Sequence, residues 1–188
     1  MGFTREQLDA ARTRQVDDLL GPGLRLLFVG INPGLWTAAV NAHFARPGNR
    51  FYPALHAARI TDHLIDASAG MSVDDVAHLI ARGIGITNVV RRATARADEL
   101  TVDELRDGAE RVARLAAAHR PRVVAVAGIT AYRTAFRQPR ANAGRQPDLL
   151  AGAQLWVVPN PSGLNAHQTV SSLAAAYRQV AVAAGVVE

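Results

Sequence analysis

The chain has 188 residues, of which 49% are hydrophobic and 20% are charged, and its formal net charge is +5. This length allows one sizeable hydrophobic core, and the balance of apolar and charged residues excludes a disordered chain. The sequence contains neither cysteine nor lysine. A disulfide scaffold, a thiol nucleophile, a Cys-ligated iron–sulfur cluster, a Schiff-base lysine and a Walker-type phosphate lysine are therefore excluded.

No apolar run approaches the roughly 18 residues that a membrane-spanning helix needs. The first twenty residues are too charged for a signal peptide, so we expect a soluble cytoplasmic protein. The net positive charge suits a polyanionic partner such as nucleic acid, which would associate the protein with the nucleoid. A GC-rich genome explains the same bias toward arginine without any partner. The charge alone therefore does not decide whether the protein binds nucleic acid.

The first half of the chain predicts helices around one clear strand. Thr4-x-x-Gln7 resembles a capping box that opens a helix extending to about Leu20, and the apolar run Leu24–Val29 reads as a buried strand. A long irregular segment follows from Gly30 to Gly48. The remaining predicted elements of this half are a helix over Asn49–Ala58, a helix over Ser72–Ala81 with Ser72 as its N-cap, and a short strand over Gly85–Val90.

The second half alternates helices with β-branched runs. Thr101-x-x-Glu104 is a second capping box, and it predicts a helix that runs to about His119. The later predicted elements are a strand over Arg122–Ala127, a helix over Ile129–Phe136, a loop over Gln138–Gly152, a strand over Gln154–Val158 and a closing helix over Thr169–Ala184.

This alternation predicts a three-layer α/β/α sandwich with a mainly parallel central sheet. We expect one domain over residues 1–188, with an N-terminal helix and turn at 1–23 and the core at 24–185. Ligands in such folds bind beyond the carboxyl ends of the strands. Two strands end in Asn-Pro, at Gly30-Ile31-Asn32-Pro33-Gly34 and at Pro159-Asn160-Pro161-Ser162-Gly163, so both loops are expected on the same edge.

Asn-Pro-Gly is ordinary turn chemistry, and each loop alone is explained by a turn. The Gly30-x-x-x-Gly34 spacing does not match the dinucleotide fingerprint, and we expect no helix directly after Gly34. Two such loops on one sheet edge favour a site, although the residues alone leave both interpretations open.

Four stretches together carry a family resemblance. "GINPGL", "HFARPGNRFY", "GITNVV" and "VVPNPSGL", in this order, resemble the mismatch-specific uracil/thymine-DNA glycosylases of the uracil-DNA glycosylase superfamily. The resemblance covers about Leu24 to Gly185. It implies a monofunctional enzyme that flips a mispaired base out of duplex DNA and hydrolyses its N-glycosyl bond, without a cofactor or metal. It also implies double-stranded DNA with a mispaired or damaged base as the partner, and we expect a monomer.

The resemblance makes Asn32 the catalytic residue. An amide is no general base at neutral pH, so its role is to hold a water below C1′ of the sugar. Faster uracil-specific relatives carry Asp at this place and His at the start of the second loop, whereas this chain has Asn32 and Asn160. We therefore expect slow chemistry, with backbone N–H groups around Ile31–Gly34 and Phe44 stabilising the departing base.

The resemblance also assigns a base pocket. Phe44 stacks on the flipped base, His43 helps to bind the base or to organise water, Thr37 gates the 5-position of the pyrimidine, and Asn88 faces the base. Without the resemblance, Phe44 reads as a core aromatic, His43 as a solvated loop residue and Asn88 as a residue that satisfies backbone groups at a strand edge.

The second loop matches the segment that enters the DNA stack. Leu164 is the implied wedge, and Gly163 and Asn165 offer main-chain groups to the orphaned guanine. The relatives place Ser and Arg after the leucine, whereas this chain has Asn165-Ala166-His167, so the demand for an opposite guanine is open. The remaining implied DNA contacts are Pro161, Ser162, His167 and Arg50.

Metal and lyase chemistry are not expected. No His, Asp or Glu cluster has metal-ligand spacing, and the lack of lysine argues against a lyase that attacks through an amine. The loop arginines Arg46, Arg91, Arg92, Arg96 and Arg140 suit phosphate contacts, but each alone is equally explained as solvated surface. Two other functions stay open: a non-catalytic reader of mispaired or abasic DNA, and a small-molecule α/β hydrolase that uses the two Asn-Pro loops.

Overall fold

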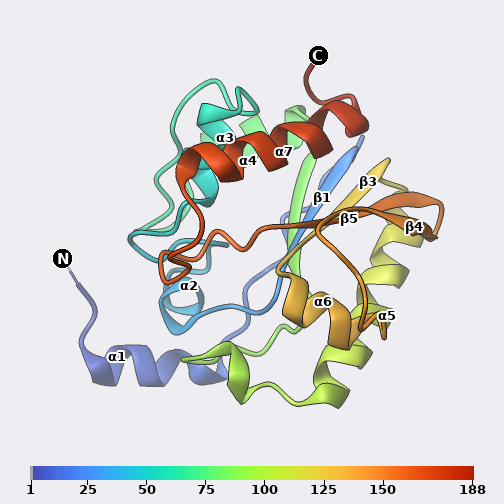
Figure 1. Cartoon of the computed structure of the whole chain (residues 1–188). Coiled ribbons are helices and arrows are strands. Elements are labelled where there is room, and N and C mark those ends of the chain that lie inside the picture. The colour runs from blue at the N-terminus through green and yellow to red at the C-terminus, as the bar shows by residue number, and fades with distance from the viewer. Residues whose placement is uncertain (1) are drawn as a thin grey trace.

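The computed structural model of the chain describes residues 2–188 (Figure 1). Five strands form one sheet in the order β2-β1-β3-β5-β4. Four of them run parallel, and β4 pairs antiparallel with β5 at the edge. The strands are β1 (Leu26–Gly30), β2 (Ile84–Asn88), β3 (Val123–Ala127), β4 (Gly144–Leu150) and β5 (Ala153–Val158).

Helices cover both faces of this sheet because the strands are apolar on both sides. On one face, Leu26 and Phe28 pack with α3 (Phe51–Ala57), α4 (Val73–Ala81) and α7 (Val170–Ala184). On the other face, Leu27 and Val29 pack with α5 (Val102–His119) and α6 (Ile129–Ala135). Figure 1 shows the two groups of helices on opposite sides of the strands. The predicted three-layer α/β/α class with a mainly parallel sheet is confirmed.

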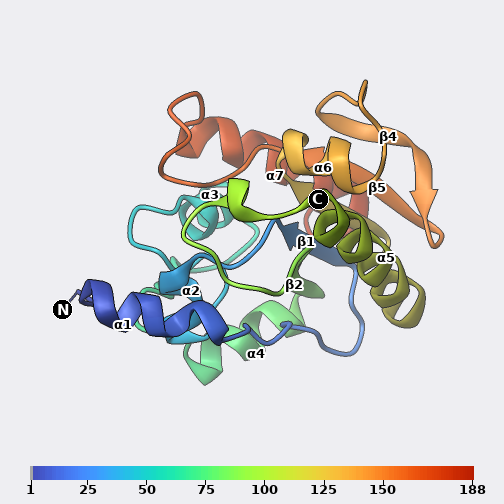
Figure 2. The same cartoon turned by 90° about the horizontal axis from the view of Figure 1, so that it is seen from below.

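The N-terminal helix is shorter than the sequence predicts. The capping box of Thr4 and Gln7 is present, but α1 (Arg5–Asp9) continues only as the 3₁₀ turn η1 (Ala10–Thr13). The chain then extends, and Leu19 exchanges two backbone hydrogen bonds with Ile86 of β2. A helix to Leu20 would forfeit this pairing. Figure 2 shows α1 beside α2 (Leu35–Val40). The ring of Phe3, just before α1, meets that of Trp36 edge to face, with centroids 4.8 Å apart.

Two further predictions of local structure are wrong. Helix α2 begins directly after Gly34, which is its N-cap without a side-chain hydrogen bond, so no capping side chain marks this start in the sequence. The segment predicted as a loop over 138–152 contains β4. Four of its seven residues are exposed, and its strand conformation depends on antiparallel pairing with β5. A third short element, η2 (Ala97–Glu99), lies in the loop after β2.

The other capping signals are confirmed. Ser72 caps α4 by accepting from the backbone N–H of Asp75, and Thr101 with Glu104 forms the capping box of α5. Gly108 then lets α5 approach β2, since a Cβ atom there would lie 2.3 Å from the carbonyl oxygen of Val89. Within residues 2–188, no helix is both long and apolar enough to cross a membrane.

Candidate active site

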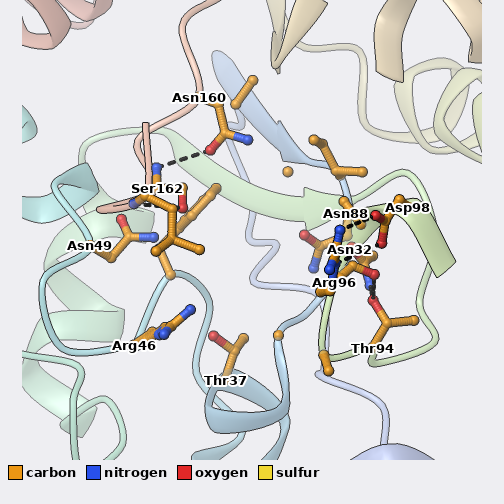
Figure 3. A pocket seen from close by; sticks show the side chains of 18 residues that line it. Asn32, Thr37, Arg46, Asn49, Asn88, Thr94, Arg96, Asp98, Asn160 and Ser162 are labelled. Carbon is orange, nitrogen blue, oxygen red and sulfur yellow. Dashed lines mark hydrogen bonds and ion pairs between the residues drawn. The ribbon is translucent and has the colours of Figure 1, made fainter. Parts of the chain in front are cut away.

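A cavity of about 440 Å³ opens beyond the carboxyl ends of the parallel strands (Figure 3). It lies where the sheet order reverses: β1 pairs with β2 on one side and with β3 on the other, which is where ligands bind in such sheets. Its volume lies within the range of roughly 300–1,000 Å³ that is typical of small-molecule sites. The side chains and backbone that line it include Gly30, Ile31, Asn32, Gly34, Thr37, Phe44, Arg46, Asn49, Asn88, Thr94, Asp98, Asn160, Ser162 and Leu164.

The amide of Asn32 has a fixed orientation in this cavity. Its Nδ2 donates to Oγ1 of Thr94 at 2.7 Å and to the backbone oxygens of Pro33 and Arg92, both at 3.1 Å. Carbonyl oxygens only accept hydrogen bonds, so the nitrogen must face them. The opposite atom, Oδ1, makes no hydrogen bond within residues 2–188 and is therefore an acceptor available to the cavity.

Thr94 completes this arrangement. Its hydroxyl donates to the carbonyl of Arg96 at 2.7 Å, which leaves the oxygen lone pairs to accept from Asn32. Thr94 is 1% exposed, so these bonds are shielded from water. The backbone N–H of Thr94 in turn donates to the carbonyl of Pro33 at 3.1 Å, which ties the loop after β2 to the loop after β1.

A chain of three groups orients Asn88 at the end of β2. Nε2 of His43 lies 2.9 Å from the carbonyl oxygen of Asp17, which can only accept, so the ring proton is on Nε2. Nδ1 of His43 then accepts from Nδ2 of Asn88 at 3.1 Å. Burial lowers the pKa of His43 to about 4, although the carbonyl of Asp17 opposes this shift, so the imidazole is neutral at pH 7.

The Oδ1 of Asn88 lies against Gly30 of the neighbouring strand. A Cβ atom at Gly30 would lie 2.4 Å from this oxygen and 3.2 Å from Cζ of Phe44. Glycine is therefore required here by space rather than by backbone conformation. The missing side chain lets the amide of Asn88 and the ring of Phe44 share the floor of the cavity.

Phe44 has a left-handed backbone, with φ of 54°, which is uncommon for an aromatic residue. Its ring stacks on Phe51 with centroids 4.0 Å apart, and the hydroxyl of Tyr52 donates to the carbonyl of His43 at 2.9 Å, which fixes the preceding residue. Phe44 is half-buried and lines the cavity, so its position suits stacking against a planar ligand. Strained backbone of this kind is concentrated at functional sites.

The second Asn-Pro loop forms the opposite rim of the cavity. Oδ1 of Asn160 accepts from the backbone N–H of Ser162 at 3.0 Å (Figure 3), and its Nδ2 makes no hydrogen bond within residues 2–188. Leu164 is 78% exposed at the rim, and its backbone N–H donates to Oγ of Ser162 at 3.3 Å. The two loops are thus on the same edge of the sheet, as the sequence predicts.

The cation Arg46 and an ion pair flank the opening. Arg96 donates to Asp98 at 3.1 Å, and Asp98 is the only carboxylate among the residues that line this cavity. Arg46 is exposed and makes no ion pair or side-chain hydrogen bond within the described chain. The opening is therefore cationic, which suits an anionic ligand such as a nucleic-acid backbone. No group of three or more His, Asp or Glu side chains in residues 2–188 is suited to a metal ion.

The structure brings together most of the site residues that the sequence predicts. Ile31, Asn32, Gly34, Thr37, Phe44, Asn88, Asn160, Ser162 and Leu164 line the cavity, whereas His43 lies behind Asn88. Pro161, Gly163, Asn165, His167 and Arg50 belong to the second loop or contact it and do not line this cavity. Sequence reasoning missed Thr94, which stands in none of the four motifs, and Asn49, which the sequence predicts only as the start of a helix.

Comparison with known proteins finds a matching family model and a solved structure of similar fold. A family model described as the uracil DNA glycosylase superfamily matches residues 18–182. Among solved structures, the chain is similar to the solution NMR structure of a candidate uracil DNA glycosylase from Methanosarcina acetivorans, with a TM-score of 0.57. The two sequences are 18% identical over 89% of this chain and 97% of the other. At this identity, the structural likeness concerns the fold.

Proposed function

The chain belongs to the uracil DNA glycosylase superfamily, and on this premise we propose that it excises uracil from G-mispaired duplex DNA. Its reaction is hydrolysis of the N-glycosyl bond, which leaves an abasic site for base excision repair. The observation that carries this proposal is the free Oδ1 of Asn32 in a cavity that faces the exposed Leu164. The acceptor, Oδ1 of Asn32, and the proposed wedge, Leu164, lie on two loops at the same edge of the sheet.

The substrate base enters the cavity after it leaves the DNA stack. Leu164 fills the space that the base vacates, as apolar wedges do in other DNA-bending proteins. In the cavity the base stacks on Phe44 and meets Asn88, whose Oδ1 accepts from N3–H while its second amide hydrogen donates to a pyrimidine carbonyl. This pairing is supported by the contact with His43, which fixes which end of the amide is donor and which is acceptor.

Asn32 then positions the nucleophile. A water donates one hydrogen bond to its Oδ1 and directs a lone pair at C1′ of the sugar, so the amide contributes orientation rather than proton abstraction. The C1′–O bond forms as the C1′–N1 bond breaks, and the base departs with the bonding electrons as an anion. The proton of the water passes to solvent. Asn160 Nδ2 and backbone N–H groups near Ile31 are suited to stabilise the negative charge on the base.

The cavity is expected to support only slow turnover. Its single carboxylate, Asp98, is paired with Arg96 and is not a free general base. The chain has no lysine, so we propose a monofunctional enzyme whose product is the abasic site. We also propose that it acts as a monomer in the cytoplasm, with Thr37 limiting access of 5-substituted pyrimidines.

A non-catalytic reader of mispaired or abasic DNA is the second candidate function. The observation that favours it is the same lack of a free carboxylate in the cavity. Such a reader needs the wedge and the pocket but no positioned water. Single-turnover excision separates the two functions, because only an enzyme releases free base under enzyme excess.

The proposal is tested with end-labelled duplexes that carry one G·U, G·T or A·U pair, followed by alkaline cleavage at abasic sites. We expect strand breaks at G·U under enzyme excess, and weaker or no cleavage at A·U. Absence of cleavage at every uracil substrate, together with tight binding to the G·U duplex, supports the reader instead.

A further inference from the structure

Arg50 donates four hydrogen bonds to the segment of the second Asn-Pro loop over residues 161–168. Its guanidinium donates to the backbone oxygens of Gln168 at 2.8 Å, Asn165 at 3.0 Å and Gly163 at 3.3 Å. Its backbone N–H also donates to the carbonyl of Pro161 at 3.0 Å. One residue, placed just before α3, therefore binds four points of the segment 161–168.

The loop before α3, which contains Gly48 and Arg50, also packs directly against segment 161–168. A Cβ atom at Gly163 would lie 2.6 Å from the carbonyl oxygen of Gly48, so the backbones of the two loops are in contact. Within the loop, the backbone N–H of Asn165 donates to the carbonyl of Ser162 at 2.9 Å, and this turn has Leu164 at its tip. The side chain of Leu164 is 78% exposed, so packing against the protein contributes little to fixing it.

An irregular loop of this kind is costly to hold in one conformation, because each ordered residue loses conformational entropy. Three hydrogen bonds from a charged donor offset that cost, and they are stronger than bonds between neutral groups. The planar fork of arginine reaches several carbonyls at once, which the single ammonium of lysine does not. Arg50 is half-buried, and its guanidinium is turned toward these carbonyls.

We propose that Arg50 is a positioning residue that holds segment 161–168 in the shape that presents Leu164 to the DNA stack. This inference rests on the proposed function and assigns Arg50 to base-pair opening rather than to phosphate binding or hydrolysis. Removal of the guanidinium frees the loop, so the wedge enters the stack less often. Hydrolysis of a base that needs no opening is largely unaffected.

The test compares Arg50→Ala and Arg50→Lys with the unaltered protein on two duplexes. In one, uracil pairs with guanine; in the other, uracil faces a tetrahydrofuran abasic analogue, so no base pair has to be broken. Single-turnover excision at saturating protein is measured on both. Arg145→Ala is the matched control, because it removes one exposed arginine from β4, at the far edge of the sheet.

We expect Arg50→Ala to lose about tenfold to a hundredfold in rate on the G·U duplex, as a misplaced positioning group does. The loss opposite the abasic analogue is expected to be within about threefold. Arg50→Lys is expected to keep one of the hydrogen bonds to the loop. Its excision rate on the G·U duplex is therefore expected to lie between those of Arg50→Ala and the unaltered protein. Adding Leu164→Ala to Arg50→Ala is expected to cause little further loss, because both changes remove the same step.

Hydrogen exchange of the backbone amides in 161–168 gives a readout that does not depend on activity. Faster exchange in Arg50→Ala or Arg50→Lys, but not in Arg145→Ala, supports the inference. Unchanged exchange overturns it, and so do equal rate losses on both duplexes. A reduced salt dependence of DNA binding with unchanged exchange identifies Arg50 as a phosphate contact instead. If Arg50→Ala does not fold, the lysine variant carries the same comparison. Failure of the unaltered protein to release uracil refutes the proposed function. The hydrogen-exchange result then still tests whether Arg50 holds segment 161–168.

Discussion

Nδ1 of His43 lies 3.1 Å from Nδ2 of Asn88, and the imidazole is held there in its neutral form by burial. Its other nitrogen faces the carbonyl of Asp17 at 2.9 Å. A second proton on the ring would remove the acceptor that fixes Asn88. The orientation of an amide in the cavity is thus linked to the protonation state of a histidine that lies behind it.

This link predicts a pH dependence of stability. The pKa of His43 is about 4 in the folded protein and about 6.5 when exposed, so the unfolded chain binds more protons between these values. The neutral ring contributes fully to the free energy of unfolding above pH 6.5, and this contribution is lost as the pH falls toward 4. The total loss is about 3 kcal/mol. Urea unfolding of the unaltered protein and of His43→Gln from pH 4 to 7.5 measures it. Parallel pH curves for the two proteins would contradict the assignment.

Thr94 is predicted to act on the reaction through Asn32. Thr94→Val keeps the shape but removes the acceptor of the 2.7 Å bond, so the amide of Asn32 gains freedom to rotate. We expect single-turnover excision to fall about tenfold while duplex affinity is unchanged, and stability to fall by about 1–2 kcal/mol. Thr94→Ser retains the hydroxyl and is expected to restore most of the rate. Equal rates for the Val and Ser variants would rule out this role.

Gly30 is predicted to be irreplaceable for the shape of the cavity. In Gly30→Ala the added Cβ meets Oδ1 of Asn88 at 2.4 Å, which forces the amide or the strand to move. We expect a loss of about 1–3 kcal/mol in the free energy of unfolding and weaker binding of free uracil. Gly34→Ala is the stability control, because its Cβ enters open space and an N-cap Gly→Ala change costs no more than about 1 kcal/mol. Comparable unfolding midpoints for the two variants would be inconsistent with a clash between the added Cβ and Oδ1 of Asn88.

Thr37 is predicted to limit the size of the base. It is 6% exposed and lines the cavity from α2, where the family resemblance expects the 5-position of the pyrimidine. Thr37→Ala removes the hydroxyl and a methyl group, so the rate ratio of G·T to G·U excision is expected to rise about tenfold. Thr134→Ala on α6 serves as the control. An unchanged ratio would place the selectivity elsewhere.

Much of the fold follows from local sequence signals. The capping residues Thr101 and Ser72 and the β-branched run of β3 predict their elements correctly, because each signal acts within a few residues. Helix α2 and strand β4 are missed for the opposite reason. Gly34 offers no capping side chain, and the strand conformation of the mostly exposed 144–150 segment depends on pairing with β5.

The site divides in the same way. Asn32 and Asn160 follow strands whose parallel order places them at one edge, so the sequence predicts their common location. Thr94 is 62 residues from Asn32, and no pattern announces their hydrogen bond. The sequence likewise identifies Arg50 as a charge near the DNA, whereas the structure shows its guanidinium on the carbonyls of the second loop. The prediction from the sequence that Arg50 contacts DNA directly is untested by the structure, and we propose the positioning role in its place.

The central claim is that Oδ1 of Asn32 holds the water that attacks the sugar. The most direct test is single-turnover release of uracil from a G·U duplex by the unaltered protein and by Asn32→Ala, with duplex affinity measured in parallel. We expect the variant to bind as tightly and to lose about a hundredfold or more in rate, because the Oδ1 that orients the water is removed. Excision at an undiminished rate by Asn32→Ala would contradict the account.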